Sequence, residues 1–448
     1  MRLPLIAAIS VAALLSACGG GSDGGSSEPT PAPAPTPGLS PTPTVFSAVS
    51  AGPLLAPISF DLNGDGTTDA TSTTSAKGQF GQGVNVLQSS LGFGTVPTTA
   101  TGRMSMGWGI DATTGLIVGH MSAPIGATII SPLTTLIDIQ GSADSVRRAL
   151  RLDAGPYAVR SETDLLQFNP ALNWQNSDTA ISQDAGRLTT INLQLLALAA
   201  YFTETPGDPV DVGVSLAKVS QHISGAMVTN ATLDLTSQAS IVALMAVLGP
   251  APDLNIPTDW RDAKADLIAK YMTAMPVRIR DEADVRAWAY TFRFFILPEL
   301  KILDRRWPNP AAARIAAIQP ADIAEVAESF RSVPAPVVGS LMAVPDYREV
   351  TDSSSPPYSL ILNDCAALTP SRLPTCSDWP IFRGPDSTEL TAVQATEPGK
   401  LTASLTKGSI YLNRVGTFTG LTHVTYETRS ASGDVATGTI FVRVREPD

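Results

Sequence analysis

The chain has 448 residues, and its 41 acidic and 30 basic side chains give a formal net charge of −11. That charge, together with the lack of a basic run, excludes nucleic acid as the expected partner, and a hydrophobic content of 44% against 16% charged residues excludes a disordered protein. Because a single hydrophobic core rarely grows beyond ~250 residues, this length predicts several domains.

The first 17 residues have the pattern of a secretory signal peptide. Arg2 precedes an apolar run over residues 3–15, which is too short to span a membrane in the mature protein. Residues 15–18 read LSAC and resemble the lipobox of bacterial lipoproteins. The resemblance implies that Cys18 carries acyl chains such as palmitate, and Gly19 in place of Asp implies the outer membrane. A plain signal peptide with an incidental Cys is the alternative.

Residues 18–44 read as a tether behind the acylated Cys18. Residues 19–28 are rich in Gly and Ser, which gives a flexible coil, and residues 29–43 are rich in Pro, which gives an extended polyproline helix. At ~3.1 Å per residue the Pro-rich part reaches ~45 Å. The folded part is therefore expected to work away from the lipid headgroups.

Residues 45–140 are expected to form a β-sandwich, because short alternating runs such as 115–121 stand between turn residues. Near its start the sequence has the spacing of a calcium-binding loop. Five oxygen donors alternate around a Gly that permits the bend: Asp61, Asn63, Asp65, the carbonyl of Thr67, and Asp69. Ser72 stands where such loops have a bidentate Glu, so we expect a structural calcium ion with a Kd of ~10⁻⁴ to 10⁻³ M. An Asn/Asp/Gly turn without metal is the alternative.

Three segments, at 60–66, 107–115 and 122–136, follow one another in an order that resembles bacterial surface proteins. Those proteins carry a prealbumin-like, carboxypeptidase-regulatory-type β-sandwich followed by helices. The resemblance covers roughly residues 50–200 and implies that segment 122–136 leads from the sandwich into the helices. It implies an architecture and no activity, because a fold does not fix a function.

Residues 141–340 are expected to form an α-helical domain. Apolar residues recur at helical spacing in three stretches, at 212–227, 260–271 and 285–296. Asp281 can cap the third helix, and the run at 188–202 is apolar almost all round, which predicts a central buried helix.

Residues 357–448 are expected to form a second β domain. Ile440, Val442 and Val444 alternate with other residues, and residues 430–434 supply a hairpin turn. The order of segments 416–420, 424–426 and 439–444 resembles bacterial Ig-like or cadherin-like domains, which serve as spacers or binders. The fold class expected for the whole chain is therefore multidomain α+β, with helices between two β-sandwiches.

The cysteines agree with export. If Cys18 carries lipid, Cys365 and Cys376 form an even pair in an oxidising compartment, which predicts a disulfide. Closing so short a loop is worth ~3 kcal/mol in the chain-entropy model. Two free thiols are the alternative.

Motifs for catalysis are scarce. The sequence has no Gly-x-Ser-x-Gly elbow, phosphate-binding loop, dinucleotide fingerprint or paired-His zinc motif. Ser215, Lys218 and His222 share one helix face, and a buried Lys can act as the base of a Ser nucleophile. That face is rotated ~100° from the apolar face, so we expect it at the solvated boundary. The 41 carboxylates leave a glycoside-hydrolase pair open, because only distance would select one.

The sequence therefore predicts an outer-membrane lipoprotein that has a non-catalytic binding, adhesion or structural role at the cell surface or in the periplasm. The expected partner is a protein or a glycan. The alternative is an envelope hydrolase whose site lies in the helical domain. A deep helical pocket lined by converging carboxylates, or by Ser215 and Lys218, would favour the hydrolase.

Overall fold

The computed structural model describes residues 46–80, 102–201, 210–228, 232–248, 258–303, 310–336, 341–343, 345–350, 365–366, 389–407, 409–429 and 433–445. The chain divides into two compact units, residues 1–43 and 44–448. The signal peptide, Cys18, the tether and Cys376 lie outside the described residues. The following concerns the second unit.

The N-terminal strands form two sheets. In the larger one the path is β4-β3-β6-β7-β9, with β2 paired to β6. Neighbours on this path are antiparallel except β7 and β9, which are parallel. The smaller sheet has the order β5-β1-β8. The strands are β1 (Phe46–Ala48), β2 (Leu54–Leu55), β3 (Pro57–Asp61), β4 (Ala70–Thr73), β5 (Gln79–Phe80), β6 (Arg103–Asp111), β7 (Ile117–Pro124), β8 (Ile129–Ile130) and β9 (Val210–Asp211).

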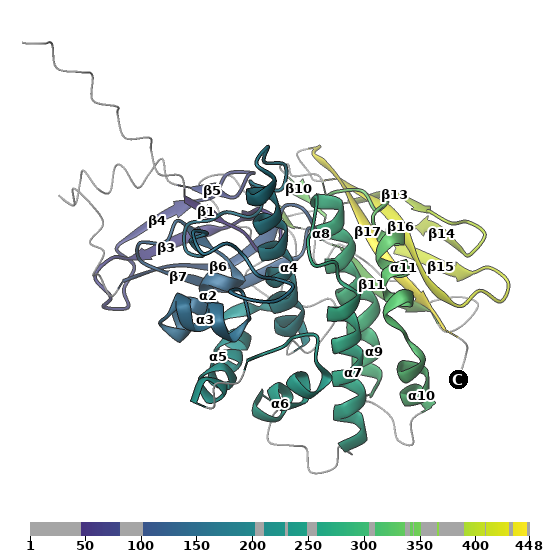
Figure 1. The fold of residues 1–448 in the computed structure, drawn as a ribbon. Coiled ribbons are helices and arrows are strands. Elements are labelled where there is room, and N and C mark those ends of the chain that lie inside the picture. The colour runs from purple at the N-terminus through teal and green to yellow at the C-terminus, as the bar shows by residue number, and fades with distance from the viewer. Residues whose placement is uncertain are drawn as a thin grey trace, which may run out of the picture. The chain divides into compact units, whose positions relative to one another are not determined.

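The middle of the chain is helical, as the apolar periodicity predicted (Figure 1). Its elements are α2 (Pro132–Gln140), α3 (Ala143–Ala149), α4 (Thr179–Tyr201), α5 (Val212–Val228), α6 (Gln238–Leu248), α7 (Thr258–Ala274), α8 (Glu282–Tyr290), the π-helical turn η1 (Thr291–Ile296), α9 (Leu297–Leu303), α10 (Pro310–Ala317) and α11 (Pro320–Phe330). The predicted cap of α8 is present, because Asp281 Oδ1 accepts the Asp284 N–H at 2.8 Å. In the described residues, no helix combines the length and apolar character that crossing a membrane requires.

The first helix begins inside the range expected to be β. Ser131 caps α2 by accepting the Thr134 N–H at 3.1 Å, while Thr134 Oγ1 accepts the Ser131 N–H at 2.8 Å. Pro132 occupies the first turn, where its missing N–H costs nothing. The next N–H, of Leu133, donates to Asn192 Oδ1 of α4 at 3.2 Å. The Ser-Pro segment is thus a helix start held by the central helix.

The C-terminal strands form a sheet with the order β11-β17-β16-β13 and a separate hairpin, β14-β15. The pairing of β11 with β17 is parallel, so this sheet begins at Asp346, before the boundary at 357 that the sequence suggested. A further short pair joins β10 to β12. The strands are β10 (Leu341–Met342), β11 (Asp346–Val350), β12 (Cys365–Ala366), β13 (Glu389–Ala395), β14 (Leu401–Thr406), β15 (Ser409–Arg414), β16 (Gly420–Arg429) and β17 (Val435–Val444).

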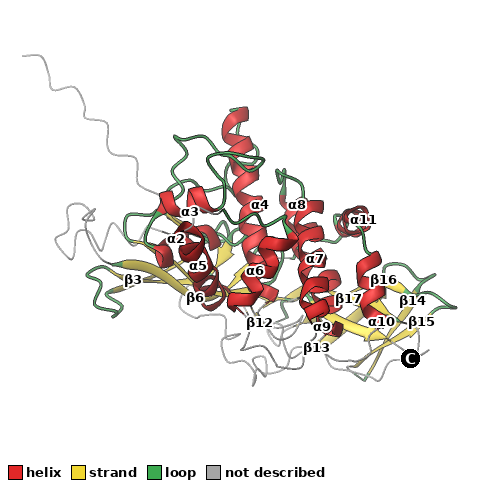
Figure 2. Cartoon of the chain, turned by 60° about the horizontal axis from the view of Figure 1, so that its bottom comes forward, coloured by secondary structure: helices red, strands yellow, loops and turns green. Residues whose placement is uncertain are grey.

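Buried apolar side chains of the described residues form two clusters. One runs from the N-terminal sheets through the helices, which gather on one side of the strands in the view of Figure 2. The other lies between the four-stranded C-terminal sheet and the β14-β15 hairpin. Strand β17 serves both, because Val442 belongs to the second cluster and its neighbour Phe441 to the first. The α+β class, with β-sheets at both ends and helices between them, is confirmed.

Candidate functional site

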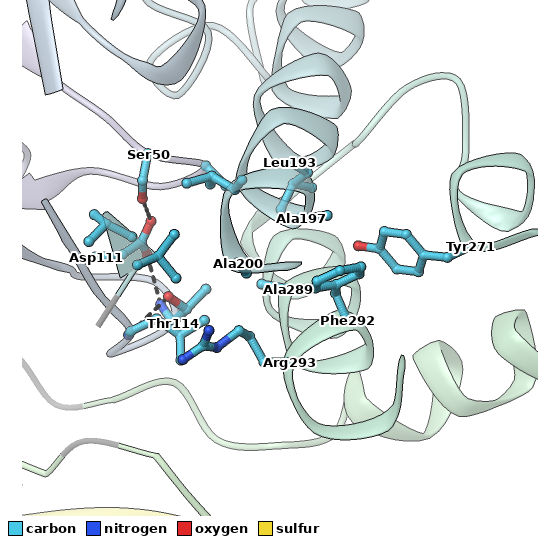
Figure 3. A pocket seen from close by; sticks show the side chains of 15 residues that line it. Ser50, Asp111, Thr114, Leu193, Ala197, Ala200, Tyr271, Ala289, Phe292 and Arg293 are labelled. Carbon is cyan, nitrogen blue, oxygen red and sulfur yellow. Dashed lines mark hydrogen bonds between the residues drawn. The ribbon is translucent and has the colours of Figure 1, made fainter. Parts of the chain in front are cut away.

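A small cavity lies where the end of β6 meets α4 and the π-helical turn (Figure 3). Its volume is about 40 Å³, which is room for two or three water molecules. Most of its wall is apolar, with Leu193, Ala197 and Ala200 of α4 opposite Phe292 of η1. The charged residues in the wall are Asp111 and Arg293.

Asp111 is a carboxylate used to build a turn. It is 1% exposed and accepts four hydrogen bonds from described residues. Its Oδ1 accepts the N–H groups of Thr113 and Thr114, each at 2.9 Å, and its Oδ2 accepts the Gly52 N–H at 2.8 Å and the Ser50 hydroxyl. Oδ1 therefore closes the Asp111–Gly115 turn, and Oδ2 joins that turn to the segment that carries Ser50. We call residues 111–115 the Asp111 turn.

Arg293 reaches the cavity from a non-standard helical segment. It is 5% exposed and lies in η1, where the helix widens to bonds between residues five apart. Single π-helical turns are frequent at functional sites, which marks this side of the cavity for attention. Neither Asp111 nor Arg293 was predicted from the sequence as a site residue. The available signals were the Asp-x-x-Thr-Gly pattern and the lone charge of Arg293 inside the apolar stretch at 287–297.

Two buried tyrosines stand beside the cavity as hydrogen-bond donors. The Tyr290 hydroxyl donates to the Thr114 carbonyl at 2.6 Å, and the Tyr271 hydroxyl donates to the Trp288 carbonyl at 2.9 Å. Desolvation raises the pKa of both phenols above its ordinary value. Both phenols therefore stay neutral near pH 7 and keep their protons in structural bonds.

The residues of the predicted calcium loop turn back onto their own backbone. Asp61 accepts the N–H groups of Gly64 and Gly66 at 2.6 and 2.9 Å, and Asp69 Oδ2 accepts that of Leu62 at 2.7 Å. Asn63 Oδ1 and Asp65 Oδ1 each accept the N–H two residues on, at 2.9 and 2.7 Å. The bonds from the Thr67 hydroxyl and N–H, and from the Asn63 amide, lower the pKa of the Asp65 carboxyl.

The contacts of Asn63 and Asp65 are Asx turns. Within the part of the chain that the structure describes, no three His, Cys, Asp or Glu side chains form a group that could hold a metal ion. Calcium binding at this loop therefore stays a prediction.

Ser215 differs from its expected position. The apolar face of α5 is buried as predicted, with Val212, Leu216 and Val219 fully buried. Ser215 is 4% exposed rather than at the solvated boundary, and its hydroxyl donates to the Ala199 carbonyl of α4 at 3.3 Å. It is buried because α5 packs against α4 on that side. Desolvation lowers the pKa of His222 on the same helix.

The predicted disulfide falls largely outside the described residues. Cys365 begins β12, and Cys376 is not among the described residues. Compared with known proteins, the chain matches no family model, no curated protein and no solved structure. What can be said about function therefore depends on the chain's own residues.

Proposed function

We propose that this protein is a lipid-anchored lipoprotein of the outer membrane with a non-catalytic binding, adhesion or structural role. The observation that carries the proposal is the sequence LSAC at 15–18 followed by the Gly/Pro-rich tether at 19–44. An acylated Cys18 would hold the chain at the lipid surface, and the tether would place residues 46–445 at a distance from it.

The polar groups of the cavity support a structural role over catalysis. Both oxygens of Asp111 already accept two hydrogen bonds each. The cavity of about 40 Å³ is far below the roughly 300–1,000 Å³ of typical small-molecule sites. A catalytic group needs a free lone pair or a proton directed at a substrate. The oxygens of Asp111 are instead engaged in holding the Asp111 turn.

The hydrolase alternative loses its best nucleophile. A Ser activated by a Lys must direct its hydroxyl toward a substrate, and the Ser215 hydroxyl instead donates to the Ala199 carbonyl between two packed helices. For the non-catalytic role we propose an envelope protein or a glycan as the partner bound at the surface. The net charge of −11 disfavours nucleic acid.

The anchor is tested by cell fractionation. Cys18→Ser removes the acylated thiol, so the protein should move from the membrane fraction to the soluble fraction. Ser26→Ala is the control, because it changes one side chain in the tether outside the lipobox and should stay in the membrane fraction. A Cys18→Ser protein that stays with the membrane would disprove the anchor. Protease added to intact cells would cut the tether and release the folded part only if the protein faces outward.

A further inference from the structure

Residues 290–299 contact both ends of the described unit, and we call them the coupling segment. They comprise the end of α8, the whole of η1 and the start of α9. One set of contacts goes to the Asp111 turn and its cavity. The other goes to strands β11 and β17 of the C-terminal sheet.

The contacts to the C-terminal sheet are aromatic and ionic. Phe294 stacks on Phe441 of β17 with ring centroids 4.2 Å apart and an interplanar angle of 12°. Arg443 of the same strand lies over the Phe295 ring, 5.6 Å from its centroid. Glu299, which is 0% exposed, forms ion pairs with Arg443 and, at 2.7 Å, with Arg314 of α10. Removing one partner of a buried ion pair is costly, so these contacts fix the rotation of α9 relative to β17.

The contacts to the N-terminal side begin one residue before the π-helical turn. The Tyr290 hydroxyl donates to the Thr114 carbonyl at 2.6 Å, and the Tyr290 ring also packs on Phe441, with centroids 4.9 Å apart. Phe292 and Arg293 line the cavity, as Figure 3 shows. One short segment thus contacts both ends, with Phe292 and Arg293 at the cavity and Phe294 and Phe295 at the C-terminal sheet.

The π-helical turn makes this double role geometrically feasible. Bonds between residues five apart place one more residue in the turn than an α-helix does. Converting the turn to α-helix would rotate everything after it by about 100° relative to everything before it. Glu299 could then not face Arg443 at the same time as Tyr290 faces Thr114. Both sets of contacts together therefore hold the turn in its wide form.

We propose that the coupling segment is a two-state element that links the C-terminal sheet energetically to the Asp111 turn and its cavity. In the state described here, Phe441 and Arg443 hold one side of the segment and Thr114 holds the other. When either side is released, the wide turn loses its register and the other side loosens. A partner that binds the C-terminal sheet thereby changes the order of the Asp111 turn, and the reverse holds by linkage. This inference does not depend on the lipid anchor.

Hydrogen exchange of the full-length protein in detergent tests the link. Phe441→Leu weakens the contact to Phe294, and Val442→Ala is the matched control, because this neighbour is equally buried but faces the other core. For Phe441→Leu we expect the amides of residues 111–116 and 291–296 to exchange about 5- to 150-fold faster, the usual range of coupling between sites. Val442→Ala should leave both stretches unchanged relative to α2, which reports any global loss of stability. Equal effects of the two variants, or no effect at 111–116, would overturn the proposal.

The reverse direction gives a second test with a milder change. Tyr290→Phe removes the hydroxyl bonded to Thr114 and keeps the ring on Phe441. Exchange in the paired strands β16 and β17 should rise, because coupling between two sites acts in both directions. Tyr157→Phe is the control, since it removes a hydroxyl that is bonded to Gln194 of α4 rather than to the Asp111 turn. A Tyr290→Phe protein with unchanged exchange in β17 would refute the two-state element.

Discussion

Replacing Asp111 by Asn should destabilise the protein strongly, although the two side chains have nearly the same shape. The carboxylate accepts two hydrogen bonds on each oxygen, from Thr113 and Thr114 on Oδ1 and from Ser50 and Gly52 on Oδ2. The amide of Asn keeps one accepting oxygen and puts an NH₂ donor in place of the other. Two buried donors then lose their acceptor.

Each buried donor left without an acceptor costs about 1–3 kcal/mol, so Asp111→Asn should lower the free energy of unfolding by about 2–6 kcal/mol. Ser50→Ala should cost less, about 1 kcal/mol, because the carboxylate keeps its three backbone donors. Asp164→Asn is the matched control, since the side chain of the exposed Asp164 accepts the Leu166 N–H at 2.9 Å and water can replace that bond. Urea denaturation followed by circular dichroism measures all three.

The order of the three losses in the free energy of unfolding tests the role of Asp111. If Asp111→Asn costs no more than Asp164→Asn, the four hydrogen bonds do not hold the Asp111 turn, and the structural role assigned to the carboxylate is incorrect. If Ser50→Ala costs as much as Asp111→Asn, the hydroxyl rather than the backbone donors holds the turn.

The other predictions concern the calcium loop, one histidine and the cysteines. Calcium at 10 mM should stabilise the folded state by about 1.4–2.7 kcal/mol for a Kd of ~10⁻³ to 10⁻⁴ M. Calorimetry should show a higher Tm with calcium than with chelator, and Asp65→Asn should make this difference smaller. An unchanged Tm would show that the loop is a turn without metal. Desolvation lowers the pKa of His423 below 6.5, and this effect is larger than the opposite effect of the Glu397 charge. The folded state therefore favours the neutral imidazole. The resulting stability is complete above about pH 6.5 and is lost as the pH falls from there through the folded pKa. Denaturation between pH 7.5 and 5 should show a smaller loss for His423→Gln than for the natural protein, and equal slopes would contradict the assignment. The predicted disulfide between Cys365 and Cys376 implies that thiol titration of the denatured, unreduced mature protein detects no free Cys. Two reactive thiols would disprove the disulfide.

Local signals were sufficient for most helices. The cap at Asp281 and the spacing of Val285, Trp288 and Phe292 predicted the start of α8 and the buried face that continues from α8 into η1. Such features are readable because a cap and an apolar stripe involve residues within a few positions of one another. The run at 188–202 was likewise expected to be the central helix, and α4 extends from Thr179 to Tyr201 with most of that run buried.

The features that make the candidate site depend on distant partners, and the sequence does not show them. The pairing of β11 with β17 joins Asp346 to Ile440, and the sequence of neither strand indicates the other as its partner. The π-helical turn follows a regular helical pattern, and it is held by Thr114 and Phe441 rather than by its own residues. Ser215 was expected at the surface because periodicity locates an apolar face and does not tell how many neighbouring helices cover it.

The double use of strand β17 has a consequence for how the chain matures. A chain leaves the ribosome, and crosses a membrane, with its N-terminal part first. The sheets and helices of residues 46–336 are then complete while their aromatic cluster still lacks Phe441, which packs on Tyr290, Phe294 and Phe330. Closing that gap requires a contact across more than a hundred residues, and contacts of such separation form slowly. The helices of the nascent protein therefore expose this aromatic surface until the last strand arrives.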